Sequence, residues 1–290
     1  MATRAVSGVG LLLALLAAAL WGLTPIAIKG ALTGYSPELV SVVRLGVATV
    51  AFRFLGGRET RWVAAEPWSA LAGVALGADF VIYNYGVRHT TAGLAALVVN
   101  IEVVATVLLA RWILGERLTA RRVVGSAVTM AGVAVVATEG IALADLFARE
   151  HTRGNAIVMI AGLTWSLFAV AQRRAPRAGN LFQLMAPIFG VAAVTTAPTL
   201  LLAGAWKNPG GSHAALMFVV LIVLCTIAVY GVYGRSQELV DVSVLAIVLA
   251  SIPVFTVALA WPLLGEAISL RTLWGGAAIL AGVLVISTER

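Results

Sequence analysis

The sequence is poor in charge, cysteine and histidine. Only 11% of its 290 residues are charged, and it contains one cysteine, Cys225, and three histidines. One cysteine cannot form an intrachain disulfide, and His89, His151 and His213 are too isolated to form a metal site. The motifs of phosphate-binding loops, zinc proteases and serine hydrolases are also missing. We therefore expect no metal, no cofactor, no soluble catalytic domain and no enzymatic activity.

Apolar residues, in contrast, make up 61% of the sequence, more than a water-soluble core of this length could bury. A bilayer core of about 30 Å needs roughly 20 apolar residues of helix. Segments such as LLLALLAAAL lack the alternation of a membrane β-barrel. The chain therefore predicts an all-α integral membrane protein with ten transmembrane helices, at 8–32, 37–56, 67–88, 92–114, 121–138, 154–173, 180–204, 213–235, 241–264 and 271–288.

The basic residues indicate how these helices are oriented. The first run, from Val9 to Ile28, is too long for the core of a cleaved signal peptide, so we expect it to be retained. With the amino terminus cytoplasmic, 13 of the 20 Lys and Arg residues lie inside, six lie outside, and Arg44 lies within a span. The positive-inside rule then predicts a multi-pass protein of the inner (plasma) membrane with both termini cytoplasmic. We expect no nucleic-acid partner, because the basic residues are scattered between the spans.

An internal repeat relates the two halves of the chain. ILGERLTARR at 113–122 is similar to LLGEAISLRT at 263–272, and 11 of 25 positions are identical between 115–139 and 265–289. Each half has five helices, an odd number, so the second half enters the membrane from the opposite side. Its outward-facing turn accordingly lacks two arginines of the first. This arrangement is typical of alternating-access transporters; duplication for stability alone is the alternative. The predicted units are 1–138, a linker at 139–153, and 154–290.

The linker at 139–153 has an amphipathic pattern. Four apolar residues fall on one face, and Asp145 and Arg149 form an i,i+4 pair on another. We expect a short helix that lies on the outer membrane surface.

Three sequence features together resemble the EamA type of the drug/metabolite transporter superfamily. They are WGLTPIAIK at 21–29, Arg44 in LVSVVRLG, and the paired turns GERLTARRVVG and GEAISLRTLWG. The resemblance implies ten helices in two inverted halves around a cavity that excludes helices five and ten. It also implies transport of amino acids, nucleotide sugars, phosphorylated sugars or cationic drugs. One departure is that such proteins usually carry a proline midway along helix four, whereas this chain has VVNIEVVAT there.

Charged residues within the spans are candidates for function. A charge at the bilayer centre costs about 2.5–3.5 kcal/mol on insertion scales, yet Arg44, Asp79 and Glu102 lie at comparable predicted depths. We hypothesise that Arg44 balances one carboxylate, which leaves the other to contact substrate or take up a proton. A fixed structural ion network is the alternative. Lys29 is a further coupling or ion-pair candidate.

Aromatic and polar residues recur at helical spacing on several spans. Such side chains could stack a planar group and orient its polar end, although Trp and Tyr also form belts at membrane interfaces. The predicted substrate-binding residues are Trp21, Thr24, Arg44, Tyr83, Trp165, Phe168, Gln172, Tyr230, Tyr233 and Gln237.

Two prolines and two helices rich in small residues suggest further roles. Pro25 and Pro253 remove backbone donors within spans and are hinge candidates. Alanines and glycines at 121–138 and 271–288 would let helices approach closely. We assign these two helices to packing or to a dimer surface, so the protein is expected to be a monomer or a homodimer.

These observations predict a secondary transporter that moves small organic metabolites by alternating access. An exporter of amino acids is the best match, with aromatic amino acids as one candidate. A multidrug carrier or a carrier of nucleotide sugars or sugar phosphates is the alternative, and an intramembrane enzyme is a remote one. Proton coupling and facilitated diffusion both remain open.

Overall fold

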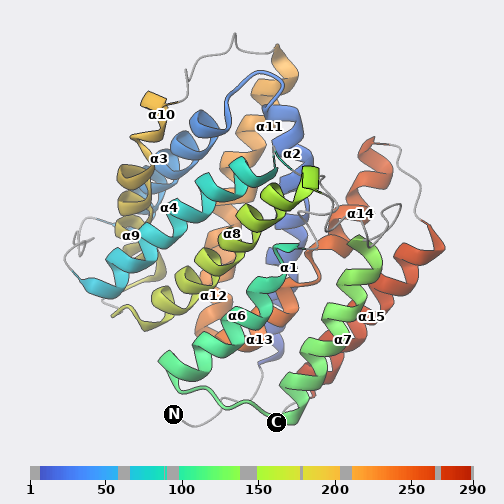
Figure 1. The fold of residues 1–290 in the computed structure, drawn as a ribbon. Coiled ribbons are helices and arrows are strands. Elements are labelled where there is room, and N and C mark those ends of the chain that lie inside the picture. Colours follow the sequence, from blue (N-terminus) through green and yellow to red (C-terminus); the bar gives the residue numbers. More distant parts are fainter. Residues whose placement is uncertain are drawn as a thin grey trace.

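A computed structural model of the protein is shown in Figure 1. It describes residues 7–57, 66–87, 89, 98–137, 149–176, 179–202, 211–264 and 269–288. These ranges consist of helices and short connections, with no strand among them. The prediction of an all-helical protein is confirmed for these residues.

Each of the ten predicted apolar runs contains helix, and several hold two or three pieces in succession. The α-helices are α1 (Gly8–Gly22), α2 (Thr24–Ala31), α3 (Pro37–Gly56), α4 (Pro67–Val87), α6 (Ile101–Leu109), α7 (Ala120–Ala137), α8 (Arg149–Arg174), α9 (Leu181–Thr196), α10 (Thr199–Leu202), α11 (Ser212–Ile222), α12 (Val229–Leu239), α13 (Val242–Leu249), α14 (Ile252–Leu264) and α15 (Leu270–Ser287). Two π-helical pieces, η1 (Ala110–Leu114) and η3 (Val223–Ala228), continue α6 and α11.

Length and composition make several of these stretches suitable for a membrane. Gly8–Ile28, Pro37–Gly56, Thr152–Arg174, Leu181–Leu201 and Ser212–Leu239 are long and apolar enough to cross one, and Val242–Thr256 and Leu273–Ser287 are shorter apolar helices. The count of ten spans, the inverted repeat and the side of the termini stay predictions. So does the surface helix in the linker, because residues 138–148 lie outside the described ranges and Arg149 already belongs to α8.

Local sequence sets both ends of α3. Ser36 caps the helix, since its Oγ accepts a hydrogen bond from the backbone N–H of Leu39 at 3.2 Å, and Pro37 occupies the first turn. Gly57 follows the last turn with a φ of 80°, a left-handed value that favours glycine. The helix therefore matches the predicted run at 37–56.

Short turns separate helical segments at three described points. α1 ends at Gly22 and α2 begins at Thr24, beside Pro25, while α13 ends at Leu249 and α14 begins just before Pro253. A turn at Val99 and Asn100 also precedes α6, although this segment has no proline. Asn100 and Ala250, which the predicted 150-residue repeat would relate, both lie in these turns.

Helices α7 and α15 lie side by side at one edge of the bundle (Figure 1, green and red). A Cβ atom on Gly132 would lie 2.6 Å from the carbonyl oxygen of Gly275, and one on Gly125 would lie 2.9 Å from that of Gly282. The small residues therefore serve the mutual packing of these helices, as expected. Dimerisation stays a prediction.

The lower end of the bundle in Figure 1, called the base below, is where α1 and α7 begin and α12 and α15 end. Ser236 Oγ donates a hydrogen bond to the Gly10 carbonyl oxygen at 2.8 Å, which fixes α12 to α1 at this level. Arg121 donates to the Thr288 carbonyl oxygen and fixes α7 to the end of α15. The first and last described residues therefore lie at the same end of the bundle.

Candidate functional site

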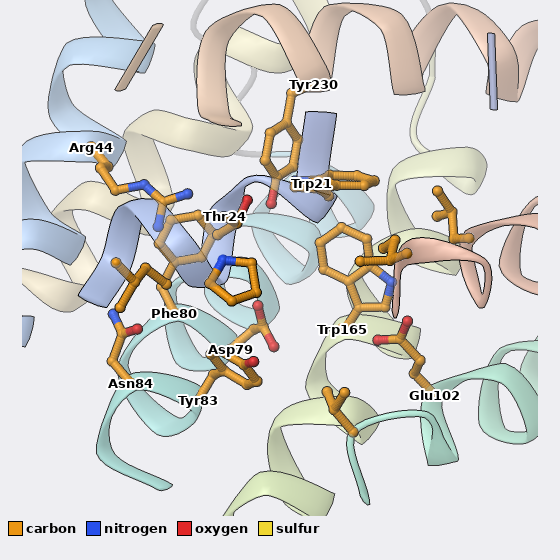
Figure 2. A pocket seen from close by; sticks show the side chains of 15 residues that line it. Trp21, Thr24, Arg44, Asp79, Phe80, Tyr83, Asn84, Glu102, Trp165 and Tyr230 are labelled. Carbon is orange, nitrogen blue, oxygen red and sulfur yellow. The ribbon is translucent and has the colours of Figure 1, made fainter. Parts of the chain in front are cut away.

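A cavity of about 180 Å³ lies within the bundle beside the break between α1 and α2 (Figure 2). Helices α1 to α4 and α6 contribute to its walls from the first half of the chain, and α8, α12, α13 and α14 from the second. None of its described lining residues belongs to α7 or α15, as the family resemblance implies. The predicted site residues that line it are Trp21, Thr24, Pro25, Arg44, Asp79, Tyr83, Glu102, Trp165 and Tyr230.

Arg44 is held in one wall by η3. Its Nε donates to Thr226 Oγ1 at 2.9 Å, and its Nη2 donates to the Cys225 carbonyl oxygen at 3.2 Å. A π-helical turn loosens the backbone hydrogen-bond ladder, and here a carbonyl of that turn accepts from a side chain. The guanidinium carbon lies 4.7 Å from the ring centroid of Phe80, a cation–π contact. Because a guanidinium has five N–H groups, donors remain for a ligand.

The carboxyl groups of Asp79 and Glu102 are the other ionisable groups of the cavity. Figure 2 shows the Asp79 carboxyl directed into the space and the Glu102 carboxyl beside Trp165. No hydrogen bond or ion pair joins either carboxyl to Arg44 among the described residues. Arg44 therefore shares the cavity with both carboxyls without a direct contact in this conformation. No cluster of three or more potential metal ligands occurs in the described ranges.

Six residues that line the cavity were missed by the sequence analysis, and two of them, Phe80 and Asn84, are aromatic or polar; the other four are the aliphatic residues Ile28, Val99, Leu249 and Ile252. Asn84 Nδ2 donates to Ser41 Oγ at 2.7 Å, which fixes the amide in place. Asp79 and Tyr83 are four residues apart, as are Phe80 and Asn84, so two adjacent rows of α4 face the cavity. This spacing was the available signal for Phe80 and Asn84.

Aromatic rings form the wall opposite Arg44, and further rings pack behind them on the side of the cavity that faces the base. The Trp21 ring lies 5.2 Å from that of Trp165 and 5.3 Å from that of Tyr230, both in edge-on geometry. Tyr233, also 5.3 Å from Trp21, and Phe168, 5.2 Å from Trp165, pack behind them and do not line the cavity. Edge-to-face contacts of this kind add stability beyond the buried area.

The remaining predicted site residues whose side chains the structure describes do not line the cavity. Gln237 is seven residues beyond Tyr230 on α12, about 10 Å along the axis, so the predicted stripe runs past the cavity to the base. Gln172 occupies the corresponding level of α8, two residues before its end. Pro253 follows the lining residue Ile252 in the first turn of α14. The side chain of Lys29 lies outside the described residues, although its backbone belongs to α2.

A second cluster of charged residues, the base network of Glu116, Arg122, Asp241 and Ser243, joins α7 to α13. Arg122 Nη2 lies 2.5 Å from Asp241 Oδ2, and Arg122 Nη1 lies 3.3 Å from Glu116 Oε2 and 2.7 Å from Ser243 Oγ. Glu116 also accepts from the backbone N–H groups of Val242 and Ser243 at 2.9 and 3.1 Å. It therefore caps α13 from another segment, and Asp241 remains available to Arg122.

Comparisons with known proteins agree with these features. A "Probable terminal-alkyne amino-acid exporter" of Streptantibioticus cattleyicolor is 30% identical over 268 residues, which cover 90% of this chain and 87% of that protein. The "Uncharacterized inner membrane transporter YhbE" of Escherichia coli (strain K12) is 22% identical over 88% of this chain and 83% of its own length. One crystal structure, at 22% identity, covers 96% of both chains with a TM-score of 0.81, which supports the fold alone.

Residues 8–138 and 152–288 each match the family described as EamA-like transporters. The family and the names of these relatives point to a transporter rather than an enzyme, and the apolar helices fit a multi-pass membrane protein. Because the two matched segments span most of the sequence, the chain belongs to the EamA-like transporter family.

Proposed function

We propose that the protein exports amino acids, aromatic ones included, across the inner membrane by alternating access. The observation that carries this proposal is the composition of the cavity, which combines one guanidinium, two carboxyls without ion pairs, and indole and phenol rings. The carboxylate of an amino acid would bind Arg44, its ammonium would bind Asp79 or Glu102, and its side chain would pack on Trp21 or Trp165. The amino-acid exporter among the relatives supports the same substrate class.

The size of the cavity supports a small substrate. Its volume of about 180 Å³ is below the roughly 300–1,000 Å³ of pockets that hold drug-sized ligands.

We further propose that ten spans form two inverted halves, residues 1–138 and 154–290, joined by the linker 139–153, with both termini cytoplasmic. The separate family match of each half and the equivalent helix breaks at Asn100 and Ala250 support this topology. The base then faces the cytoplasm, and the conformation described is closed on that side. Tags in the turns at Glu116 and Glu266 should be exposed on opposite sides of the membrane, and exposure on one side would refute the inversion.

A carrier of organic cations is the second candidate. The cavity has two carboxyls and one guanidinium, and the guanidinium already bonds to Thr226 and Cys225. Phosphorylated substrates have less support, because Arg44 is the one basic side chain among the described lining residues.

Flux into liposomes that contain the purified protein tests the proposal. Amino acids, nucleotide sugars and cationic dyes would be compared with and without a pH gradient. We expect saturable flux of amino acids, which falls strongly in Arg44→Ala. Wild-type flux in a well-folded Arg44→Ala protein would contradict the assigned carboxylate site. Dye transport without amino acid transport would establish the second candidate.

A further inference from the structure

Gln172 of α8 and Gln237 of α12 are fully buried near the base, yet their amides are incompletely hydrogen-bonded. Both side chains are 0% exposed. Neither amide atom of Gln172, nor Oε1 of Gln237, has a partner among the described residues. Gln237 Nε2 donates to Tyr233 OH at 2.9 Å and to the Ala169 carbonyl oxygen at 3.3 Å. Three buried polar atoms at one level are therefore unsatisfied.

Unsatisfied amides are unfavourable in a protein interior. A buried polar atom that loses its water without gaining a partner destabilises the fold, whereas leucine fits a similar volume without that cost. Two glutamines at this level are better explained by a second conformation in which water or a ligand satisfies them.

The two glutamines lie in line with the cavity. Trp21 lines the cavity, Tyr233 packs on Trp21, and the Tyr233 hydroxyl accepts from Gln237. Gln237 is two residues from the end of α12 at Leu239, about 3 Å along the axis. The order from the middle of the bundle outwards is therefore cavity, aromatic layer, glutamines and base.

The contacts that close this level join segments from different halves of the chain. α12 is fixed to α1 by the hydrogen bond from Ser236 Oγ to the Gly10 carbonyl oxygen. α8 is fixed to η1 by the hydrogen bond from Arg174 Nη1 to the Ile113 carbonyl oxygen at 2.9 Å. A movement that opened the base would break such contacts and admit water to the glutamines.

We propose that Gln172 and Gln237 form a second binding station, on the base side of the transport pathway, for the polar end of the substrate. The proposal rests on the transport function above and extends it to a site outside the cavity. A carboxamide both donates and accepts hydrogen bonds, so the pair suits the carboxylate and ammonium groups of an amino acid. The station is closed in the conformation described and becomes hydrated when the base opens.

Cysteine labelling tests whether the station opens. The native cysteine, buried Cys225, would be replaced by alanine, and Gln172→Cys and Gln237→Cys would be introduced separately. A membrane-impermeant methanethiosulfonate would be applied to each side of sealed vesicles. We expect both positions to react from the same side as Arg121→Cys, which marks the exposed base, and not from the other side. Ala192→Cys, equally buried but packed against α4, should stay unlabelled.

Leucine substitutions test whether the amides contact substrate. In Gln172→Leu and Gln237→Leu we expect flux to fall about tenfold, the effect of one lost hydrogen bond in transit. In Gln172→Leu the melting temperature should stay the same or rise, because a wholly unsatisfied amide is removed. Gln237→Leu also loses the hydrogen bonds to Tyr233 and Ala169, so its flux is compared at equal amounts of folded protein and the stability test rests on Gln172→Leu. A merely structural role would lower the melting temperature instead.

The outcomes separate this proposal from the proposed function. Labelling from the base side without amino acid flux would leave the pathway intact and refute the substrate class. Amino acid flux without labelling at either position, or wild-type flux in both leucine variants, would overturn the second station and leave the function in place.

Discussion

The base network and the cavity are both built from ionisable side chains, but these side chains are satisfied to different degrees. In the base network the side chains of Arg122, Glu116 and Asp241 are 1%, 10% and 12% exposed, and each bonds to another member. In the cavity, the carboxyl groups of Asp79 and Glu102 have no hydrogen-bond or ion-pair partner among the described residues, although the insertion cost of such charges is high. A saturated cluster indicates a structural role, and an unsaturated one indicates a ligand.

The repeat extends the comparison to the two ends of the molecule. By its 150-residue offset, the positions equivalent to Arg122 and Asp241 are Thr272 and Thr91. The charged pair therefore has no counterpart at the repeat-related positions of the sequence. Within a transporter of inverted halves, such a difference would favour the conformation in which the base is closed.

The largest effect is expected where the saturated cluster is broken. Arg122→Ala leaves Glu116 and Asp241 without their cation, and removing one partner of a buried ion pair destabilises proteins by about 3–5 kcal/mol. Thermal unfolding of the purified protein would measure the loss. Arg121→Ala, which removes a neighbouring arginine with one solvent-exposed hydrogen bond to the Thr288 carbonyl oxygen, is the matched control and should change stability much less, because water can replace an exposed partner. Equal melting temperatures for the two variants would show that the base network does not stabilise the fold.

Helix positions were predictable from sequence where local signals set them. The run at 37–56 coincides with α3 because Ser36, Pro37 and Gly57 define its ends locally. The turn at Asn100 was not predictable, since no proline marks it. The π-helical turns of η3 were not predictable either, because no local sequence signal marks them. They are seen in the structure, where the Cys225 carbonyl oxygen accepts a hydrogen bond from Arg44.

The next largest effect should follow neutralisation of the cavity carboxyls. Asp79→Asn and Glu102→Gln remove a charge that has no ion-pair partner in the described structure, so unfolding temperatures should stay near that of the wild type. Flux of a zwitterionic amino acid should fall roughly 10–100-fold in the variant whose carboxyl binds the ammonium, as for other hydrogen bonds to charged groups.

The pH gradient separates the two carboxyls further. If transport is proton-coupled, the variant that lost the coupling carboxyl should no longer respond to the gradient, while the other variant keeps its response. If both variants transport at the wild-type rate, the two cavity carboxyls do not bind a ligand. The lack of partners would then not distinguish a functional cluster from the structural base network.

For the candidate site, the sequence predicted which residue types are involved and how deep they lie in the spans. It did not predict which of them contact one another or line the cavity. Arg44, Asp79 and Glu102 stood out because charges are costly within spans, and all three line the cavity. The stripe from Tyr230 to Gln237 was correctly placed on one helix face, but a face does not reveal where along its length the cavity ends. Asn84 carries no charge, so only its contact with Ser41 and the cavity identifies it.

The smallest effect concerns the one aromatic hydroxyl that Figure 2 shows directed into the cavity from α12, that of Tyr230. Tyr230→Phe keeps the edge-on contacts with Trp21 and Phe189, at 5.3 and 4.8 Å, so the fold should be unchanged. One neutral hydrogen bond to substrate is worth about 0.5–1.5 kcal/mol, which corresponds to a roughly 2–10-fold loss of flux. Tyr35→Phe, whose ring packs on Phe218 away from the cavity, should transport normally. An equal loss of flux in both variants would mean that the tyrosine hydroxyls affect transport through packing. A loss confined to Tyr230→Phe would show that the site contains a neutral hydrogen-bond donor in addition to its charged groups.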